Sequence, residues 1–63
     1  MIEIQGDVWL ASEIRGILVI TGKPVLVVQF KDGTNERYAF ENMAQVFPVL
    51  INAVKQWKAA IGL

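Results

Sequence analysis

The stretch that decides the fold is KPVLVVQFKDGTNERYAF, residues 23–40. It contains two runs of alternating apolar residues, and Asp32-Gly33 joins them. An Asp-Gly pair between two such runs is among the strongest local signals for a β-hairpin. We therefore predict two antiparallel strands here and build the rest of the chain around them.

The register of this hairpin follows from the side chains that each turn geometry brings together. A two-residue turn at Asp32-Gly33 would mix polar and apolar groups on both faces. A three-residue loop over residues 31–33, with Gly33 at positive φ, gathers the aromatic and branched residues on one face instead. We predict this second register, with a core face made of Leu26, Val28, Phe30, Tyr38 and Phe40.

The segment before the hairpin, IRGILVI at residues 14–20, is predicted to form a third strand. It is too short and too rich in Ile and Val to favour a helix, and Gly16 within it indicates a bulge or a close backbone contact. Residues 21–24 turn the chain, with Gly22 predicted as the first central residue of a type II′ turn. This register pairs Ile17 with Val28, Val19 with Leu26 and Ile20 with Val25.

The N-terminal residues alternate in two short arms. We predict two strands around a tight turn at Gly6-Asp7. Residues 11–13 then interrupt the apolar pattern, and Ser12 is predicted to cap a single helical turn there.

After Phe40 the apolar period changes from two to about 3.6 residues, which indicates a helix. Asn42 is the predicted N-cap, but Pro48 would remove an interior helical hydrogen bond. We therefore predict a short helical turn over residues 43–46, a break, and a main helix that starts near Pro48 and stops at Gly62. The stripe predicted to face the sheet is Phe47, Leu50, Ile51, Val54, Trp57 and Ile61.

Together these elements predict an α+β fold in a single domain, residues 1–63. An antiparallel β-meander of four to five strands carries a C-terminal α-helix packed on one face. The side chains predicted to be the most buried are Leu26, Val28, Phe30, Phe40, Leu50, Val54 and Trp57.

The composition excludes several classes of functional site. The chain has no Cys and no His, so disulfide frameworks, thiolate or imidazole metal sites and His-activated nucleophiles are excluded. No pair of carboxylates stands out as acid and base, and we expect neither enzyme activity nor a cofactor. Six basic and six acidic residues cancel, so the positive field of a phosphate-backbone binder is missing.

The sequence predicts no membrane span, and Trp57 between Lys55 and Lys58, a pattern that resembles an interfacial membrane helix, is better explained as a core-facing Trp. The first residues, MIEIQGDVW, lack the basic and then apolar pattern of a signal peptide, and no apolar run approaches the ~18 residues of a membrane span. We expect a cytoplasmic location.

The face of the meander opposite the helix is the predicted working surface. The chain is 54% hydrophobic, and a single helix covers only one face of a sheet. We predict a small interaction protein that associates with itself, a dimer being the leading expectation, or that binds and modulates another protein. The predicted interface residues are Leu18, Ile20, Val25, Val27, Gln29, Arg37 and Ala39.

Two alternatives stay open. A dimeric nucleic-acid-binding or regulatory module would use aromatic and basic side chains for stacking and phosphate contact, although nucleic acid is not the expected partner. A small-molecule site at a subunit interface would be lined by Trp9 or Tyr38. The candidate contact residues for a ligand or a nucleic acid are Trp9, Arg15, Lys23 and Tyr38.

Overall fold

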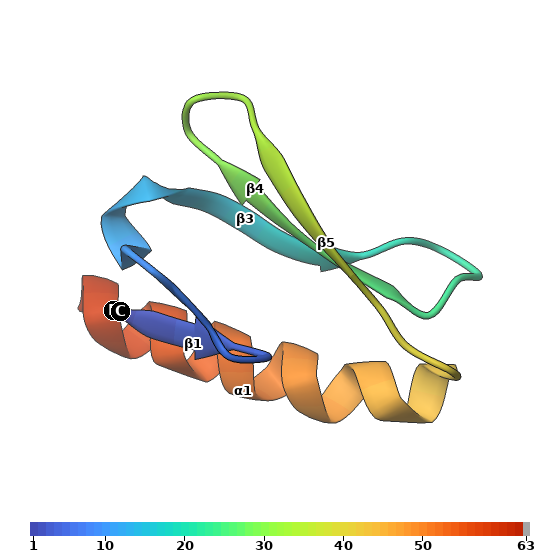
Figure 1. Ribbon diagram of the computed structural model, residues 1–63. Coiled ribbons are helices and arrows are strands. Elements are labelled where there is room, and N and C mark those ends of the chain that lie inside the picture. Colours follow the sequence, from blue (N-terminus) through green and yellow to red (C-terminus); the bar gives the residue numbers. More distant parts are fainter. Residues whose placement is uncertain (63) are drawn as a thin grey trace.

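The computed structural model describes residues 1–62, in which five strands, one 3₁₀ turn and one long helix form a small α+β fold (Figure 1). The predicted class is confirmed: the strands are antiparallel and the C-terminal helix packs on one side of the sheet. The strands divide into two sheets, the hairpin β1–β2 and the meander β3-β4-β5. The elements are β1 (Ile2–Ile4), β2 (Asp7–Trp9), the 3₁₀ turn η1 (Ala11–Glu13), β3 (Ile14–Val19), β4 (Val25–Phe30), β5 (Asn35–Ala39) and α1 (Met43–Ile61).

The β4–β5 hairpin has the predicted register. The N–H of Phe30 donates to the carbonyl of Thr34 at 2.9 Å, and Gly33 has a φ of 93°, so the three-residue loop is confirmed. The carboxylate of Asp32 accepts hydrogen bonds from the hydroxyl and the backbone N–H of Thr34, at 2.6 and 2.9 Å. These two bonds hold the pKa of Asp32 below its ordinary value, and the bond from the Thr34 hydroxyl has the larger effect. They also stabilise the loop.

The β3–β4 pairing also follows the prediction, including a bulge next to Gly16. The register shifts between Ile14 and Gly16. A Cβ at Gly16 would lie 3.2 Å from Oε1 of Gln29, which explains the glycine. The turn prediction was wrong by one position, because the N–H of Lys23 donates to the carbonyl of Ile20 at 3.1 Å. Gly22 is therefore the second central residue of that turn, with a φ of 77°.

The N-terminal hairpin turns one residue earlier than predicted. Ile4 pairs with Asp7, so Gln5 and Gly6 form the turn with φ values of 50° and 86°, as a type I′ hairpin requires. Asp7 is the first residue of β2, and its carboxylate accepts a hydrogen bond from the hydroxyl of Tyr38. Residues 11–13 form the predicted helical turn, but its N-cap is Leu10 and no side chain caps it, so Ser12 does not have the predicted role.

Helix α1 runs without a break through Pro48, and the predicted interruption was wrong. Asn42 is the N-cap, as predicted, and its side chain accepts from the N–H of Gln45 at 3.1 Å. Pro48 removes only one helical donor, the partner of the carbonyl of Ala44. Ala44 is exposed, so water can hydrogen-bond that carbonyl and the helix continues.

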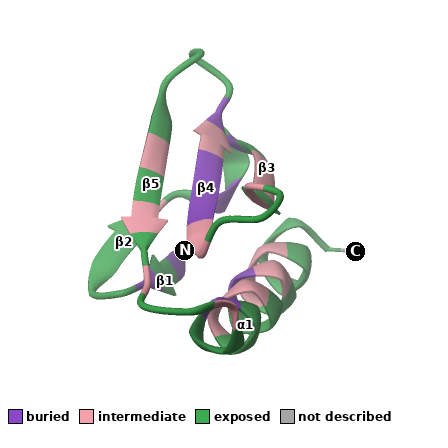
Figure 2. Ribbon diagram, turned by 90° about the vertical axis from the view of Figure 1, so that its right-hand side faces the viewer, coloured by how far each residue is buried: buried purple, intermediate pink, exposed green. Residues whose placement is uncertain are grey.

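The core lies between the inner side of the meander, helix α1 and the β1–β2 hairpin (Figure 2). Leu26, Val28 and Phe30 are buried as predicted, whereas the other four predicted core residues are only half-buried. Ile2 and Ile4 of β1, at 1% exposure each, are fully buried in the core instead. The fully buried large side chains are Ile2, Ile4, Ile14, Leu26, Val28 and Val46.

The face of α1 that meets the core differs from the predicted stripe. Val46 and Ala53 are buried, and Leu50 and Trp57 pack beside them. Phe47, Ile51 and Ile61, which were predicted to face the sheet, are 49%, 59% and 41% exposed. The prediction failed because α1 carries apolar residues on two sides, and periodicity alone does not say which side is buried.

Candidate interaction surface

The outer sheet face is the side of the meander that points away from α1. All seven predicted interface residues lie on it, because alternate residues of paired strands point to the same side. The strand register arranges the face as three rows across the sheet. These rows are Gly16, Gln29 and Asn35; Leu18, Val27 and Arg37; and Ile20, Val25 and Ala39.

The chain leaves this face open. Helix α1 and the β1–β2 hairpin both lie on the inner side of the meander, as Figure 1 shows. No other helix or strand within residues 1–62 lies on the outer side. The outer sheet face is therefore an apolar sheet surface that meets solvent in the single chain.

The apolar residues of the outer sheet face are exposed to different degrees. Val27 is only 6% exposed, because it sits in the central strand between Leu18 and Arg37. Leu18 is 38% exposed, and Ile20 and Val25 are half-buried. The accessible apolar surface is thus the row of Ile20, Val25 and Ala39, next to the turn at residues 21–24, together with Leu18. The opposite end of the face is polar.

Strand β5 is an open edge of the same sheet. Among the described strands it pairs only with β4. The hydrogen bonds of Phe30 with Thr34 and of Phe40 with Pro24 show which backbone groups of β5 point toward β4. By the antiparallel alternation, the backbone groups of the intervening residues Asn35, Arg37 and Ala39 point outward. The charged side chains of Glu36 and Arg37 on this edge oppose unlimited strand addition.

Trp9 and Tyr38, two of the four candidate ligand contacts, lie together, but on the inner side. The indole N–H of Trp9 donates to the hydroxyl of Tyr38 at 3.1 Å, and this hydroxyl donates to Asp7 at 2.8 Å. The ring of Trp9 also packs against Phe30, with centroids 4.9 Å apart. Burial, and then the bond to Asp7, raise the pKa of Tyr38 to about 12. These contacts attach the β1–β2 hairpin to the meander.

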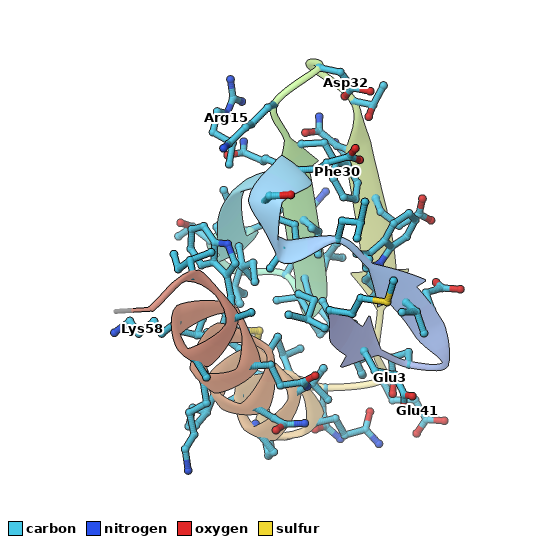
Figure 3. The ribbon with its side chains drawn as sticks, turned by 90° about the vertical axis from the view of Figure 1, so that its left-hand side faces the viewer. Glu3, Arg15, Phe30, Asp32, Glu41 and Lys58 are labelled. Atoms are coloured by element: carbon cyan, nitrogen blue, oxygen red, sulfur yellow. The ribbon has the colours of Figure 1, made fainter. Side chains whose placement is uncertain are left out.

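The two basic candidates lie far from each other along the meander. Arg15 is in the bulge of β3 near the Asp32 loop, as Figure 3 shows, and Lys23 is in the turn at the other end of β4. Both are exposed. The structure therefore does not bring the four residues together into one basic and aromatic surface.

Neither of two hollows in the surface of residues 1–62 is lined by Trp9 or Tyr38. The larger, about 590 Å³, is wide open and lies between the Gln5-Gly6 turn and α1 near Pro48. The smaller, about 220 Å³, lies beside η1 and is lined by Phe30 and Asp32 among others. Within residues 1–62 no three acidic side chains gather as metal ligands would. Over the same residues, no helix is long and apolar enough to cross a membrane.

A second apolar surface was missed by the sequence analysis, although the signal was present. Phe47 and Ile51 are one turn apart on the solvent side of α1, and both are about half exposed. The apolar residues of α1 are too numerous for one buried stripe, and this excess was the available signal.

Comparison with protein-family models, curated proteins and solved structures found no match. The function is therefore inferred from the chemistry and geometry of this chain.

Proposed function

We propose that the protein is a non-enzymatic interaction module that forms a homodimer through the outer sheet face. The observation that supports this most strongly is the uncovered apolar surface of Leu18, Ile20 and Val25 beside the buried Val27. Contiguous exposed apolar surface on a small domain commonly marks an interface. The cytoplasmic location and the lack of enzyme activity expected from the sequence belong to the same proposal.

A two-fold dimer suits the arrangement of this face. The symmetry axis would set the row of Ile20, Val25 and Ala39 against its own copy, since a two-fold interface uses the same patch twice. Gln29 and Arg37 would then form the polar rim that such interfaces have. The open edge of β5 lies beside the same patch and gives backbone donors and acceptors to the rim.

The energetics favour a weak dimer. Full burial of an exposed branched side chain gains about 1.5–3 kcal/mol, and the partly exposed Leu18, Ile20 and Val25 would gain roughly a third of that. Six such side chains in a dimer give a gross gain on the order of 4 kcal/mol, which only matches the low end of the association cost of about 4–15 kcal/mol. We therefore expect reversible, concentration-dependent association.

The nucleic-acid alternative is less well supported. Arg15 and Lys23 are at different ends of the meander, and Trp9 and Tyr38 are engaged with each other on the inner side. Stacking and phosphate contacts would have to be made from separate surfaces, which a single-stranded binder does not do.

The test is the molar mass by light scattering over a range of concentrations. We expect the wild-type protein to approach the dimer mass at high micromolar concentration, and Leu18→Glu to stay monomeric. Leu18 is suitable because it is partly exposed in the single chain, whereas a charge at Val27 would also disrupt the monomer.

The matched control is Val8→Glu, which puts the same charge on an exposed aliphatic residue of the other sheet, 55% exposed. This variant should dimerise like the wild type. A wild-type protein that stays monomeric throughout would refute the homodimer and leave a different protein as the occupant of this face.

A further inference from the structure

Helix α1 carries a heptad-like row on its solvent side. The residues recur at intervals of 3, 4, 3, 4 and 3, which is the spacing of the contact positions in a coiled coil. All but one of them are apolar. This outer helix seam consists of Ala44, Phe47, Ile51, Val54, Lys58 and Ile61.

The core cluster does not include the outer helix seam. The core is built on a neighbouring face of α1, roughly 100° around the helix at 3.6 residues per turn, from Val46 and Ala53 with Leu50 and Trp57 beside them. Phe47 and Ile51 stay 49% and 59% exposed, and Val54 is not part of the core cluster. An exposed aromatic and an exposed branched residue one turn apart form the kind of anchor pair that helix-in-groove recognition uses.

The charge of α1 indicates what covers the seam. Its 19 residues include no Asp or Glu, and Lys55 and Lys58 lie at the C-terminal half of the seam. In Figure 3, Lys58 extends from the helix into solvent. The seam is therefore apolar at one end and positive at the other, which complements a partner that is apolar and acidic.

A second copy of α1 fits this charge pattern poorly. Parallel pairing would place the lysines of both copies together. Antiparallel pairing would bring them to the positive N-terminal end of the other helix, whose first turn has no acidic residue.

A membrane surface fits poorly as well. Trp57, the residue suited to a bilayer interface, is engaged, since its indole N–H donates to the carbonyl of Ala11 at 3.2 Å. Lys58 lies in line with Phe47 and Ile51, at 3.6 residues per turn, so the face that would enter a bilayer contains a charge.

We propose that the outer helix seam is the docking site for an acidic amphipathic helix of another protein. The apolar face of that helix packs on Phe47, Ile51 and Val54, and its carboxylates meet Lys55 and Lys58. The seam is about 26 Å long from Ala44 to Ile61 at 1.5 Å per residue. Helix α1, which carries the seam, lies on the side of the meander opposite the outer sheet face, so a dimer would present two such sites (Figure 1).

The experiment titrates the full chain with two synthetic helical peptides of about three heptads each. Both have Leu at the contact positions; one has Glu at the flanking positions and the other has Lys. We expect micromolar binding of the Glu peptide, weakened by salt, and binding of the Lys peptide that is weaker by about tenfold or more.

Variants make the test specific. Ile51→Glu should weaken the Glu peptide by about tenfold or more, while Val8→Glu, an equal charge on an exposed aliphatic residue elsewhere, should not. Replacing Lys55 and Lys58 together by Glu should reverse the preference to the Lys peptide. Circular dichroism checks that each variant is folded.

Four results would overturn the proposal. Equal binding of both peptides, or no binding of either, would remove the charge-selected helix site. Adsorption to vesicles of anionic lipid that is lost in Ile51→Glu would assign the seam to a membrane. Loss of the dimer mass in Ile51→Glu would assign it to a second copy.

Discussion

The inner and outer faces of the meander are formed by the same three strands, but they are buried to different degrees. On the inner face Leu26 and Val28 are completely buried, while their neighbour Leu18 on the outer face is 38% exposed. Both faces are apolar, so composition does not separate them. The difference is that α1 and the β1–β2 hairpin cover only the inner one. An apolar face therefore becomes a core or an interface according to what covers it.

The largest expected effect is on the inner face. Leu26→Ala should lower the free energy of unfolding by about 2–5 kcal/mol, because it leaves a cavity at a site with 0% exposure. Leu18→Ala, measured at a concentration where the chain is monomeric, should cost less than about 1 kcal/mol. Denaturant unfolding measures both. Equal costs would mean that the two faces do not differ as the structure shows.

A smaller effect is expected from the contact that holds β1 over the inner face. The side-chain amide of Gln56 accepts from the N–H of Glu3 at 2.8 Å and donates to its carbonyl at 3.0 Å, as a neighbouring strand would. Gln56→Ala should cost about 2 kcal/mol, since a hydrogen bond contributes about 1 kcal/mol. Asn52→Ala, also on α1, is the control.

Hydrogen exchange reports on this contact directly. The amide of Glu3 should exchange faster in Gln56→Ala than in the wild type or in Asn52→Ala. Unchanged exchange at Glu3 would show that the amide contact does not hold β1 in place.

An effect of similar size is expected from the hydroxyl that links the β1–β2 hairpin to the meander. Tyr38→Phe removes the bonds to Trp9 and Asp7 and should also cost about 2 kcal/mol, at about 1 kcal/mol for each bond. The pKa of Tyr38 is raised from 10.0 to about 12, so the neutral form is favoured in the folded state. The contribution of the neutral Tyr38 hydroxyl to the free energy of unfolding is complete below pH 10 and is lost as the pH rises towards about 12.

The chain has a single tyrosine, so an ultraviolet titration of phenolate formation reports on Tyr38 alone. The difference in stability between the wild type and Tyr38→Phe should shrink over the same pH range. A midpoint near 10, the ordinary value, would contradict the partly buried, hydrogen-bonded hydroxyl.

Local chemistry made much of the meander predictable. The Asp32-Gly33 pair, the glycine in the bulge and the alternation in β4 determine both strand registers from residues close in sequence. The elements that failed depend on distant contacts. Helix α1 continues through Pro48 because core contacts stabilise it both before and after the proline, at Val46 and Ala53. Ile2 and Ile4 are buried only because α1 covers them.

The candidate surface was predictable to the same extent. A period of two places all seven interface residues on one face whatever the rest of the chain does. The near-complete burial of Val27 needed knowledge of its flanking residues, Leu18 and Arg37. The outer helix seam was hidden because a helix that is apolar on two sides has no unique inner face in its sequence.

The most direct test of the homodimer through the outer sheet face is an isotope-filtered nuclear Overhauser experiment on a mixture of labelled and unlabelled protein at high micromolar concentration. We expect intermolecular cross-peaks from the methyl groups of Leu18, Ile20 and Val25, and none from Leu26. Intermolecular cross-peaks from Phe47 and Ile51 instead, or the absence of any, would contradict it.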